Sequence, residues 1–171
     1  MKDLKWYMDN GQLIKTPFMS RFVDNFLEKA HLNLTTMSIL SDLEKNSEAR
    51  KILNVPEEYS PSEWVTITGY YSMYMAALSA LAKVNYRSKN HVATVLALEE
   101  FFVKKGLLEK EILELIKRAR LEMEYVEMIR SAKDKREIAQ YSPTKRITES
   151  IAVEIKRDAY RFVERIEKLI S

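Results

Sequence analysis

The sequence contains no cysteine, and this absence excludes several kinds of site. Disulfide bonds, zinc sites built on thiolates and cysteine nucleophiles all depend on that residue. Only two histidines are present, His31 and His91, which is too few for a histidine-rich metal site within one chain. We therefore expect neither a metal ion nor a cofactor.

Long apolar runs are also missing. No segment approaches the roughly 18 apolar residues that a transmembrane helix needs, and residues 1–5 lack the apolar stretch of a secretory signal. Hydrophobic residues make up 46% and charged residues 31% of the 171-residue chain, which is the balance of a globular domain with a sizeable core. The expectation is a cytoplasmic protein without a membrane-spanning segment.

Glycine and proline are scarce, with three and four residues, and they mark where the elements end. The Asn10–Gly11 pair lies between two short apolar segments, 5–8 and 13–16, and predicts a β-hairpin because both turn positions need a positive φ. An irregular leader with a single turn is the alternative. We treat residues 1–16 as an N-terminal extension and residues 17–171 as one domain.

After residue 17, apolar side chains recur at three- and four-residue steps, which is the period of an amphipathic helix. The pattern predicts five helices, over residues 18–43, 61–85, 88–105, 109–141 and 147–169. Before the second helix, Ser60–Glu63 has the sequence of a capping box, and Gly106 follows the third as a C-terminal stop. The predicted fold is all-α, an up-down bundle of four to five helices with the N-terminal hairpin as a small addition.

The second predicted helix is apolar on several sides. From Trp64 to Leu98 the chain has no acidic residue, and tyrosines occupy positions 70, 71 and 74. Such a helix is typical of the centre of a bundle, packed by neighbouring helices or by a second subunit. Core packing with hydroxyls bonded at the rim is the preferred interpretation of the tyrosines, and stacking on a nucleic-acid base is the alternative. The amount of apolar surface also favours a homodimer.

The net charge of +3 is distributed unevenly along the chain. Residues 130–146 hold six basic side chains against two acidic ones, and residues 83–91 add Lys83, Arg87 and Lys89 without an acidic one. In an up-down bundle, the start of the third helix and the far end of the fourth fall at the same end of the molecule. We therefore expect the two basic segments to converge and to bind an anion, which is RNA, a nucleotide or an acidic partner.

At that end, the first N–H groups of the third helix are expected to suit a phosphate. The residues expected to contact the ligand are Lys89, Arg130, Arg136, Tyr141 and Arg146. A solvated basic surface without a ligand is the alternative.

Four short segments carry a resemblance to a known family. They are Tyr70–Ala76 in the second predicted helix, Lys89–His91 at the start of the third, Arg136–Tyr141 in the fourth and Ala159–Val163 in the last. In this order they resemble the Tyr-Tyr-Ala-Met-Phe/Tyr-His-Ala, Lys-Ser-His, Arg-x-x-Ala-Asp-Tyr and Ala-x-x-Phe-Val elements of the HEPN family of prokaryotic helical-bundle proteins. The resemblance covers about residues 17–171 and concerns in particular small stand-alone members of unassigned function. It implies a homodimer and, as in two-gene toxin–antitoxin systems, a nucleotidyltransferase partner.

The sequence also departs from that family. Met75 stands where the family often has histidine, and Gln140 where it often has aspartate. Active HEPN ribonucleases are similar in fold and carry an arginine that is followed, after four to six residues, by a histidine. Here Arg87 and His91 are separated by three residues, and Arg136 has no histidine after it.

These departures weigh against catalysis. RNA cleavage without a metal needs a base, an acid and positive charge beside the phosphate, and His91 is the histidine that lies among basic residues. The preferred hypothesis is a non-catalytic module that binds RNA, a nucleotide or a partner protein. The alternative is a metal-independent endoribonuclease with a composite site at a dimer interface, in which His91 and Arg87 are catalytic. For His91, capping of the third helix or a local hydrogen bond competes with either role, and for His31 we expect a packed or surface position.

Overall fold

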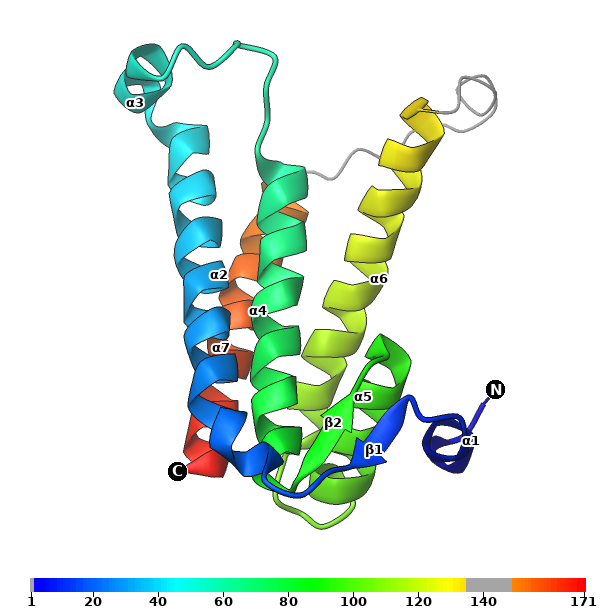
Figure 1. Ribbon diagram of the computed structural model, residues 1–171. Helices are drawn as coiled ribbons and strands as arrows, with labels where there is room; N and C mark the ends of the chain where they lie inside the picture. The colour runs from blue at the N-terminus through cyan, green and yellow to red at the C-terminus, as the bar shows by residue number, and fades with distance from the viewer. Residues whose placement is uncertain (1, 135–148) are drawn as a thin grey trace.

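The structure is a computed structural model that describes residues 2–134, with side chains as far as Met128, and residues 149–171 (Figure 1). The elements follow one another along the chain as α1 (Leu4–Asp9), β1 (Leu13–Lys15), the 3₁₀ helix η1 (Met19–Phe22), α2 (Val23–Lys45), α3 (Ser47–Ile52), α4 (Ser62–Lys83), β2 (Tyr86–Ser88), α5 (His91–Leu98), the π-helix η2 (Glu99–Val103), α6 (Lys110–Asp134) and α7 (Glu149–Ile170). The prediction of an all-α bundle with a small antiparallel sheet is confirmed. None of the described helices is both long and apolar enough to cross a membrane.

Helix α4 lies at the centre of the bundle. Helices α2 and α7 pack along it, and α6 stands on its other side (Figure 1). Of its 22 residues, 15 are buried, because small side chains such as Ala76, Ala77 and Ala80 let the neighbouring helices come close. Tyr70 and Tyr74 are among the buried residues, as the core-packing interpretation predicts. Since one chain hides most of α4, the apolar surface of this helix no longer argues for a homodimer.

Gly69 marks a close approach between α4 and its neighbours. A Cβ atom at this position would lie 2.6 Å from Ile155 Cγ2 in α7 and 3.0 Å from Met37 Sδ in α2. Both distances are shorter than an ordinary van der Waals contact, so a larger residue fits only if α2 or α7 gives way. Gly69 therefore sets how tightly three helices pack.

The two-stranded sheet joins segments that are far apart in the sequence. Strand β1 pairs antiparallel with β2, with Leu13 opposite Ser88 and Lys15 opposite Tyr86. The predicted hairpin at Asn10–Gly11 is wrong: Gly11 has the positive φ, 65°, but Asn10 has φ of −95° and ends α1. Residues 5–8 are therefore not a strand. They belong to α1, because Asp3 caps this helix by accepting a hydrogen bond of 2.8 Å from the Trp6 N–H.

Several predicted helix boundaries shift by a few residues. Helix α4 begins at Ser62, whose N–H donates to Ser60 Oγ at 3.3 Å, one residue later than predicted. The third helix begins at His91 and not at residue 88, because residues 86–88 form β2. The fourth predicted helix is confirmed from Lys110 to Asp134, and residues 135–141 lie outside the described residues.

Helix α3 is an element that the apolar period does not indicate. Asn46 caps it by accepting a hydrogen bond of 2.9 Å from the Ala49 N–H. Arg50 then donates to the carbonyl oxygens of Pro56 and Tyr59 at 2.8 and 2.9 Å, which holds the loop that leads to α4. No residue of α3 is buried, so a search for a buried face cannot find this helix.

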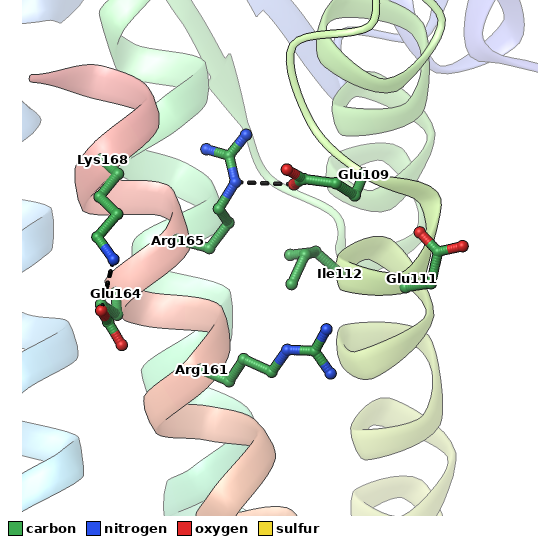
Figure 2. A pocket seen from close by; sticks show the side chains of 7 residues that line it. All are labelled: Glu109, Glu111, Ile112, Arg161, Glu164, Arg165 and Lys168. Carbon is green, nitrogen blue, oxygen red and sulfur yellow. Dashed lines mark hydrogen bonds and ion pairs between the residues drawn. The ribbon is translucent and has the colours of Figure 1, made fainter.

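Helices α6 and α7 leave a cavity of about 430 Å³ between them, here called the α6–α7 cavity (Figure 2). It lies where the first turn of α6 faces the last turns of α7. Its lining residues are Glu109, Glu111, Ile112, Arg161, Glu164, Arg165 and Lys168.

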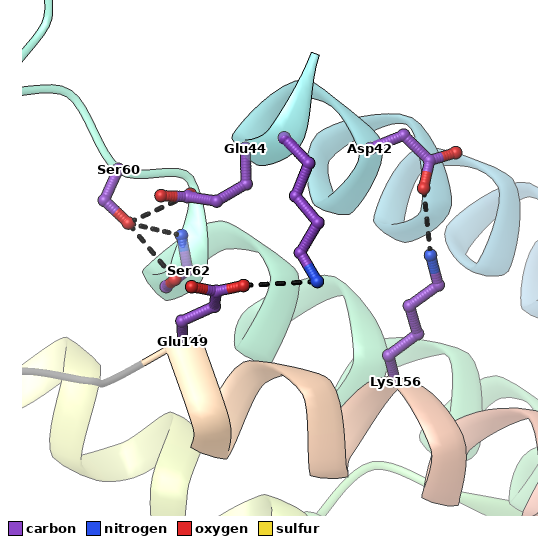
Figure 3. A network of polar contacts seen from close by, with 7 residues as sticks. Asp42, Glu44, Ser60, Ser62, Glu149 and Lys156 are labelled. Atoms are coloured by element: carbon purple, nitrogen blue, oxygen red, sulfur yellow. Dashed lines mark hydrogen bonds and ion pairs between the residues drawn. The ribbon is translucent and has the colours of Figure 1, made fainter.

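At the other end of α7, polar contacts tie three helices together (Figure 3). Lys45 Nζ lies 3.3 Å from Glu149 Oε1, and Lys156 Nζ lies 3.3 Å from Asp42 Oδ1, so both pairs join the end of α2 to the start of α7. The Ser60 hydroxyl donates to Glu44 Oε2 at 3.2 Å and joins the start of α4 to them. Exposed ion pairs of this kind contribute at most about 1 kcal/mol each, so they orient the helix ends more than they stabilise the fold.

We predict that Gly69→Ala lowers the free energy of unfolding. The added methyl group overpacks the contact with Ile155, which costs about 1–3 kcal/mol, and this cost exceeds the gain of about 1 kcal/mol in helix propensity. Urea denaturation of the purified protein measures the difference.

The Ile155→Ala background supplies the control. That background removes the contact with Ile155 Cγ2 and leaves Met37 Sδ at 3.0 Å, the end of a flexible side chain. Gly69→Ala is therefore expected to be much less destabilising there, and the two effects form a double-mutant cycle. If Gly69→Ala has the same effect in both backgrounds, the close approach is not what selects glycine here.

Candidate functional site

Asn90 occupies the start of α5 that was expected to bind a phosphate. The Asn90 Oδ1 atom accepts hydrogen bonds from the N–H groups of Val92 and Ala93, at 2.9 and 3.1 Å. The Asn90 carbonyl oxygen accepts a further one from the Thr94 N–H at 2.9 Å. Three of the N–H groups that an anion could use are thus already bonded to Asn90, which weighs against a phosphate at this helix end. The phosphate site stays a prediction.

His91 packs against the tyrosines of α4. Its Nδ1 atom is hydrogen-bonded to the Tyr70 hydroxyl. Its ring stacks on Tyr74, with ring centroids 4.2 Å apart and an angle of 16° between the planes. The ring of Tyr71 meets it edge-on at 6.3 Å. These four residues form the tyrosine–histidine cluster, in which His91 makes the local hydrogen bond that competed with a functional role.

Helix α6 supplies the charges closest to this cluster. Burial and the neighbouring Arg120 guanidinium lower the pKa of His91 below its ordinary value, while Glu124 and Glu127 act in the opposite direction. Arg120 itself is paired with Glu124, with 3.2 Å between Nε and Oε1. At neutral pH the His91 imidazole is therefore uncharged, and one cation and two carboxylates surround it.

The Tyr70 hydroxyl and His91 Nδ1 share one hydrogen bond. Burial raises the pKa of Tyr70 well above its ordinary value, so its hydroxyl stays protonated. Either atom can be the donor, depending on which ring nitrogen of the neutral imidazole carries its one proton. With the hydroxyl as the donor, that proton is at Nε2, and Nε2 then donates a hydrogen bond and cannot take a proton from a ribose 2′-hydroxyl.

The second histidine does not join the first. His31 lies on α2, where its Nε2 atom is 2.5 Å from Glu167 Oε1 in α7, and its side chain is 52% exposed. This is the surface position that the sequence predicts for His31. Within the described residues of one chain, no second imidazole accompanies His91, and the acid–base pair of a ribonuclease is not assembled.

Arg87 lies on the outer face of the small sheet, and Lys89 follows β2 directly. Arg87 is opposite Ile14 in the sheet, so it points to the face away from the buried Leu13. Both cations are exposed, and among the described residues neither has an acidic partner. They are close together in sequence and in space, but neither contacts the tyrosine–histidine cluster through a hydrogen bond in the described part of the chain.

The expected convergence of the two basic segments does not occur among the described residues. Lys83 donates to the Ile170 carbonyl oxygen at 2.6 Å, at the C-terminal end of α7. Helix α6 ends at Asp134, at the opposite end of the bundle (Figure 1). The reason is that β2 runs back along α4 before α5 begins, so His91 meets the middle of α6 and not its far end.

The remaining predicted ligand residues fall on the fourth helix and beyond it. Arg130 lies in α6, in the part where the backbone alone is described. Arg136, Tyr141 and Arg146 lie outside the described residues. Their part in a binding site stays a prediction.

Sequence reasoning missed the contribution of α6 to the site. Arg120, Glu124 and Glu127 follow one another at four- and three-residue steps, so they share one face of the helix. That spacing is visible in the sequence, but nothing in it tells that this face meets His91. Among the described residues, no group of three or more histidine, aspartate and glutamate side chains is placed to hold a metal ion.

We predict that Arg120→Gln raises the pKa of His91 toward its ordinary value. The substitution removes the charge that, after burial, does most to lower the pKa, and it releases the Glu124 carboxylate that raises it. A pH titration of the His91 ring signals by NMR measures the change, and Lys117→Gln removes a cation from the same helix as a control.

The same shift has a consequence for stability. Because folding lowers the pKa of His91, the unfolded chain binds a proton more readily than the folded chain. The free energy of unfolding is therefore highest while His91 is neutral in both states, and it decreases as the pH falls below about 6.5. The loss is expected to be smaller in Arg120→Gln than in the wild type. An unchanged His91 pKa in Arg120→Gln, or an equal rise in Lys117→Gln, would contradict the proposed electrostatics.

Comparison with known proteins adds no assignment to this geometry. No protein-family model matches the chain, and no curated protein matches it either. The resemblance to the HEPN family therefore rests on the four short segments and stays a prediction.

Proposed function

We propose that this chain is a non-catalytic binding module of HEPN type whose ligand is RNA or a nucleotide. The observation that carries the proposal is the pair of exposed cations formed by Arg87 on the outer face of the small sheet and Lys89 directly after β2. They belong to the stretch from residue 64 to 98, which contains no acidic residue, so no carboxylate of that stretch neutralises them. The phosphate groups of RNA or of a nucleotide would supply the negative charge that Arg87 and Lys89 lack nearby.

The chemistry of His91 supports binding over turnover. Its Nδ1 atom is bonded to Tyr70, and its nearest charges include two carboxylates, which repel a phosphodiester. A phosphate site is therefore disfavoured at this position. The same residues serve the packing of α4 against α5, which is a structural role.

The second contact region of the proposal is the segment 130–146. Its sequence carries a net charge of +4 from six basic and two acidic residues, and Arg136 and Arg146 are the cations that we assign to the ligand. Arg87 with Lys89 and Arg136 with Arg146 form two separate pairs for mutation, so each region is tested without the other.

The resemblance extends the proposal to partners. We propose a homodimer and, as in two-gene toxin–antitoxin systems, a nucleotidyltransferase partner. The burial of α4 within one chain leaves the family resemblance as the support for the homodimer. An acidic surface on the partner would engage the same cations as an RNA phosphate.

We predict that reversing both charges, Arg87→Glu with Lys89→Glu, weakens binding to single-stranded RNA. Each lost phosphate contact reduces the steepness of the salt dependence, so the slope of log K against log salt should fall in magnitude by about 1.4 for two contacts. Fluorescence anisotropy of a labelled oligonucleotide at several salt concentrations measures both the affinity and the slope.

The matched control is Lys29→Glu with Lys51→Glu, which changes the net charge equally at two exposed lysines of α2 and α3. This control should keep most of the affinity. Equal weakening in the two double variants would mean that net charge alone matters, and a wild type that does not bind RNA or nucleotide would remove the proposal.

We also predict that the wild-type protein leaves RNA intact in the presence of EDTA. The ribonuclease alternative requires metal-free cleavage that is lost in His91→Ala. Gel analysis of several labelled RNAs after prolonged incubation distinguishes the two functions. Cleavage by the wild type that disappears in His91→Ala would replace the binding proposal by the alternative.

A further inference from the structure

The α6–α7 cavity is separate from the surfaces considered above. None of its lining residues belongs to the tyrosine–histidine cluster or to the sheet that carries Arg87 and Lys89. Its volume of about 430 Å³ falls in the range of roughly 300–1,000 Å³ that small-molecule sites occupy. It is thus large enough for a small organic ligand.

Arg161 reaches into this cavity without a protein partner. Its side chain extends from α7 across the cavity toward α6, close to Ile112 (Figure 2). Among the described residues it makes no ion pair and no hydrogen bond. A guanidinium stays charged at any physiological pH and offers five N–H donors in one plane.

Arg165 is held next to Arg161 in a fixed position. Its Nε atom donates to Glu109 Oε2 at 2.7 Å, and its Nη2 atom donates to the Leu107 carbonyl oxygen at 2.7 Å. Its side chain is 25% exposed. The two hydrogen bonds anchor the guanidinium to the loop before α6 and leave its Nη1 donors for another acceptor.

Three carboxylates, of Glu109, Glu111 and Glu164, and three cations, of Arg161, Arg165 and Lys168, line the cavity, but they are unevenly placed. The hydrogen bond from Arg165, together with the charges of Arg165 and Arg161, holds the pKa of Glu109 below its usual range, so this carboxylate is ionised. Figure 2 shows Glu164 paired with Lys168 on the side of α7 away from α6, with 2.6 Å between the two charged groups, and Glu111 on the side of α6 away from α7. Between the helices, the guanidinium groups of Arg161 and Arg165 therefore face the carboxylate of Glu109.

We propose that the α6–α7 cavity binds a small organic anion, with a carboxylate or phosphate group between Arg161 and Arg165 and an apolar part against Ile112. A planar guanidinium matches either group through two parallel N–H···O bonds. The buried Ile112 side chain offers an apolar wall, so an anion with an aromatic or aliphatic body is preferred over a bare inorganic ion.

Three probes test the site in the full-length protein. Phenyl phosphate, benzoate and inorganic phosphate are titrated while NMR follows the backbone amides of residues 109–112 and the Nε–H signals of Arg161 and Arg165. We expect saturable shifts confined to these signals, with tighter binding of phenyl phosphate than of inorganic phosphate. The comparison of phenyl phosphate with benzoate tells whether the site prefers phosphate or carboxylate.

Two glutamine variants decide the assignment. Arg161→Gln is expected to weaken phenyl phosphate binding on the order of 10-fold, since it removes a charged hydrogen-bond donor, and Lys29→Gln removes an equal charge elsewhere without effect. Arg161 makes no ion pair or hydrogen bond among the described residues and acts on Glu109 through its charge alone, so its replacement should change the melting temperature little and leave RNA binding unchanged. Shifts that do not saturate, or equal weakening in both variants, would overturn the proposal without touching the proposed RNA site.

Discussion

The close approach of α2 and α7 to α4 at Gly69 is the constraint on which the rest of the structure depends. With no Cβ atom at Gly69, Ile155 of α7 and Met37 of α2 lie against the α4 backbone. A helix packed on these sides must be apolar around most of its circumference, which explains why acidic residues are missing from residues 64–83 of α4. It also buries the tyrosines, whose hydroxyl groups must then find hydrogen-bond partners inside the protein.

That need for partners determines what His91 can do. A buried hydroxyl without a hydrogen bond costs about 1–3 kcal/mol, and for Tyr70 the partner is His91 Nδ1. The buried carboxylate of Asp158, only 3% exposed, is handled in the same way by ion pairs with Arg118 of α6 and with Arg157. His91 and Asp158 are of residue types that are often catalytic, but here each is paired with another residue inside the protein. Both therefore have a structural role.

The parts of the fold that depend on local period could be predicted from the sequence, and those that depend on distant pairing could not. The long helices α2, α4, α6 and α7 follow from three- and four-residue spacing. Strand β1 was placed correctly, but its partner lies some 70 residues away in β2, which no turn signal near Gly11 can reveal. The predicted convergence of basic segments is not seen for residues 130–134 for a related reason: β2 takes the first residues of the predicted third helix, and α5 begins beside the middle of α6. Residues 135–146 lie outside the described residues. Arg120 was missed because its contact with His91 is also non-local.

Arg87, Lys89 and Arg161 are cations without an ion pair among the described residues. The surroundings of the first two differ from those of Arg161, so we expect the two places to bind different ligands. At many positions a carboxylate one helical turn away pairs with a lysine, as Glu100 does with Lys104. Arg87 and Lys89 lack such a neighbour because residues 64–98 contain no acidic residue, and both side chains are exposed, which suits an extended polyanion. Arg161 has no ion pair because Glu109 is already paired with Arg165. It lines the α6–α7 cavity, whose size suits a small molecule. The same kind of excess charge thus arises from two independent causes, which is why the loss of one site is not expected to affect the other.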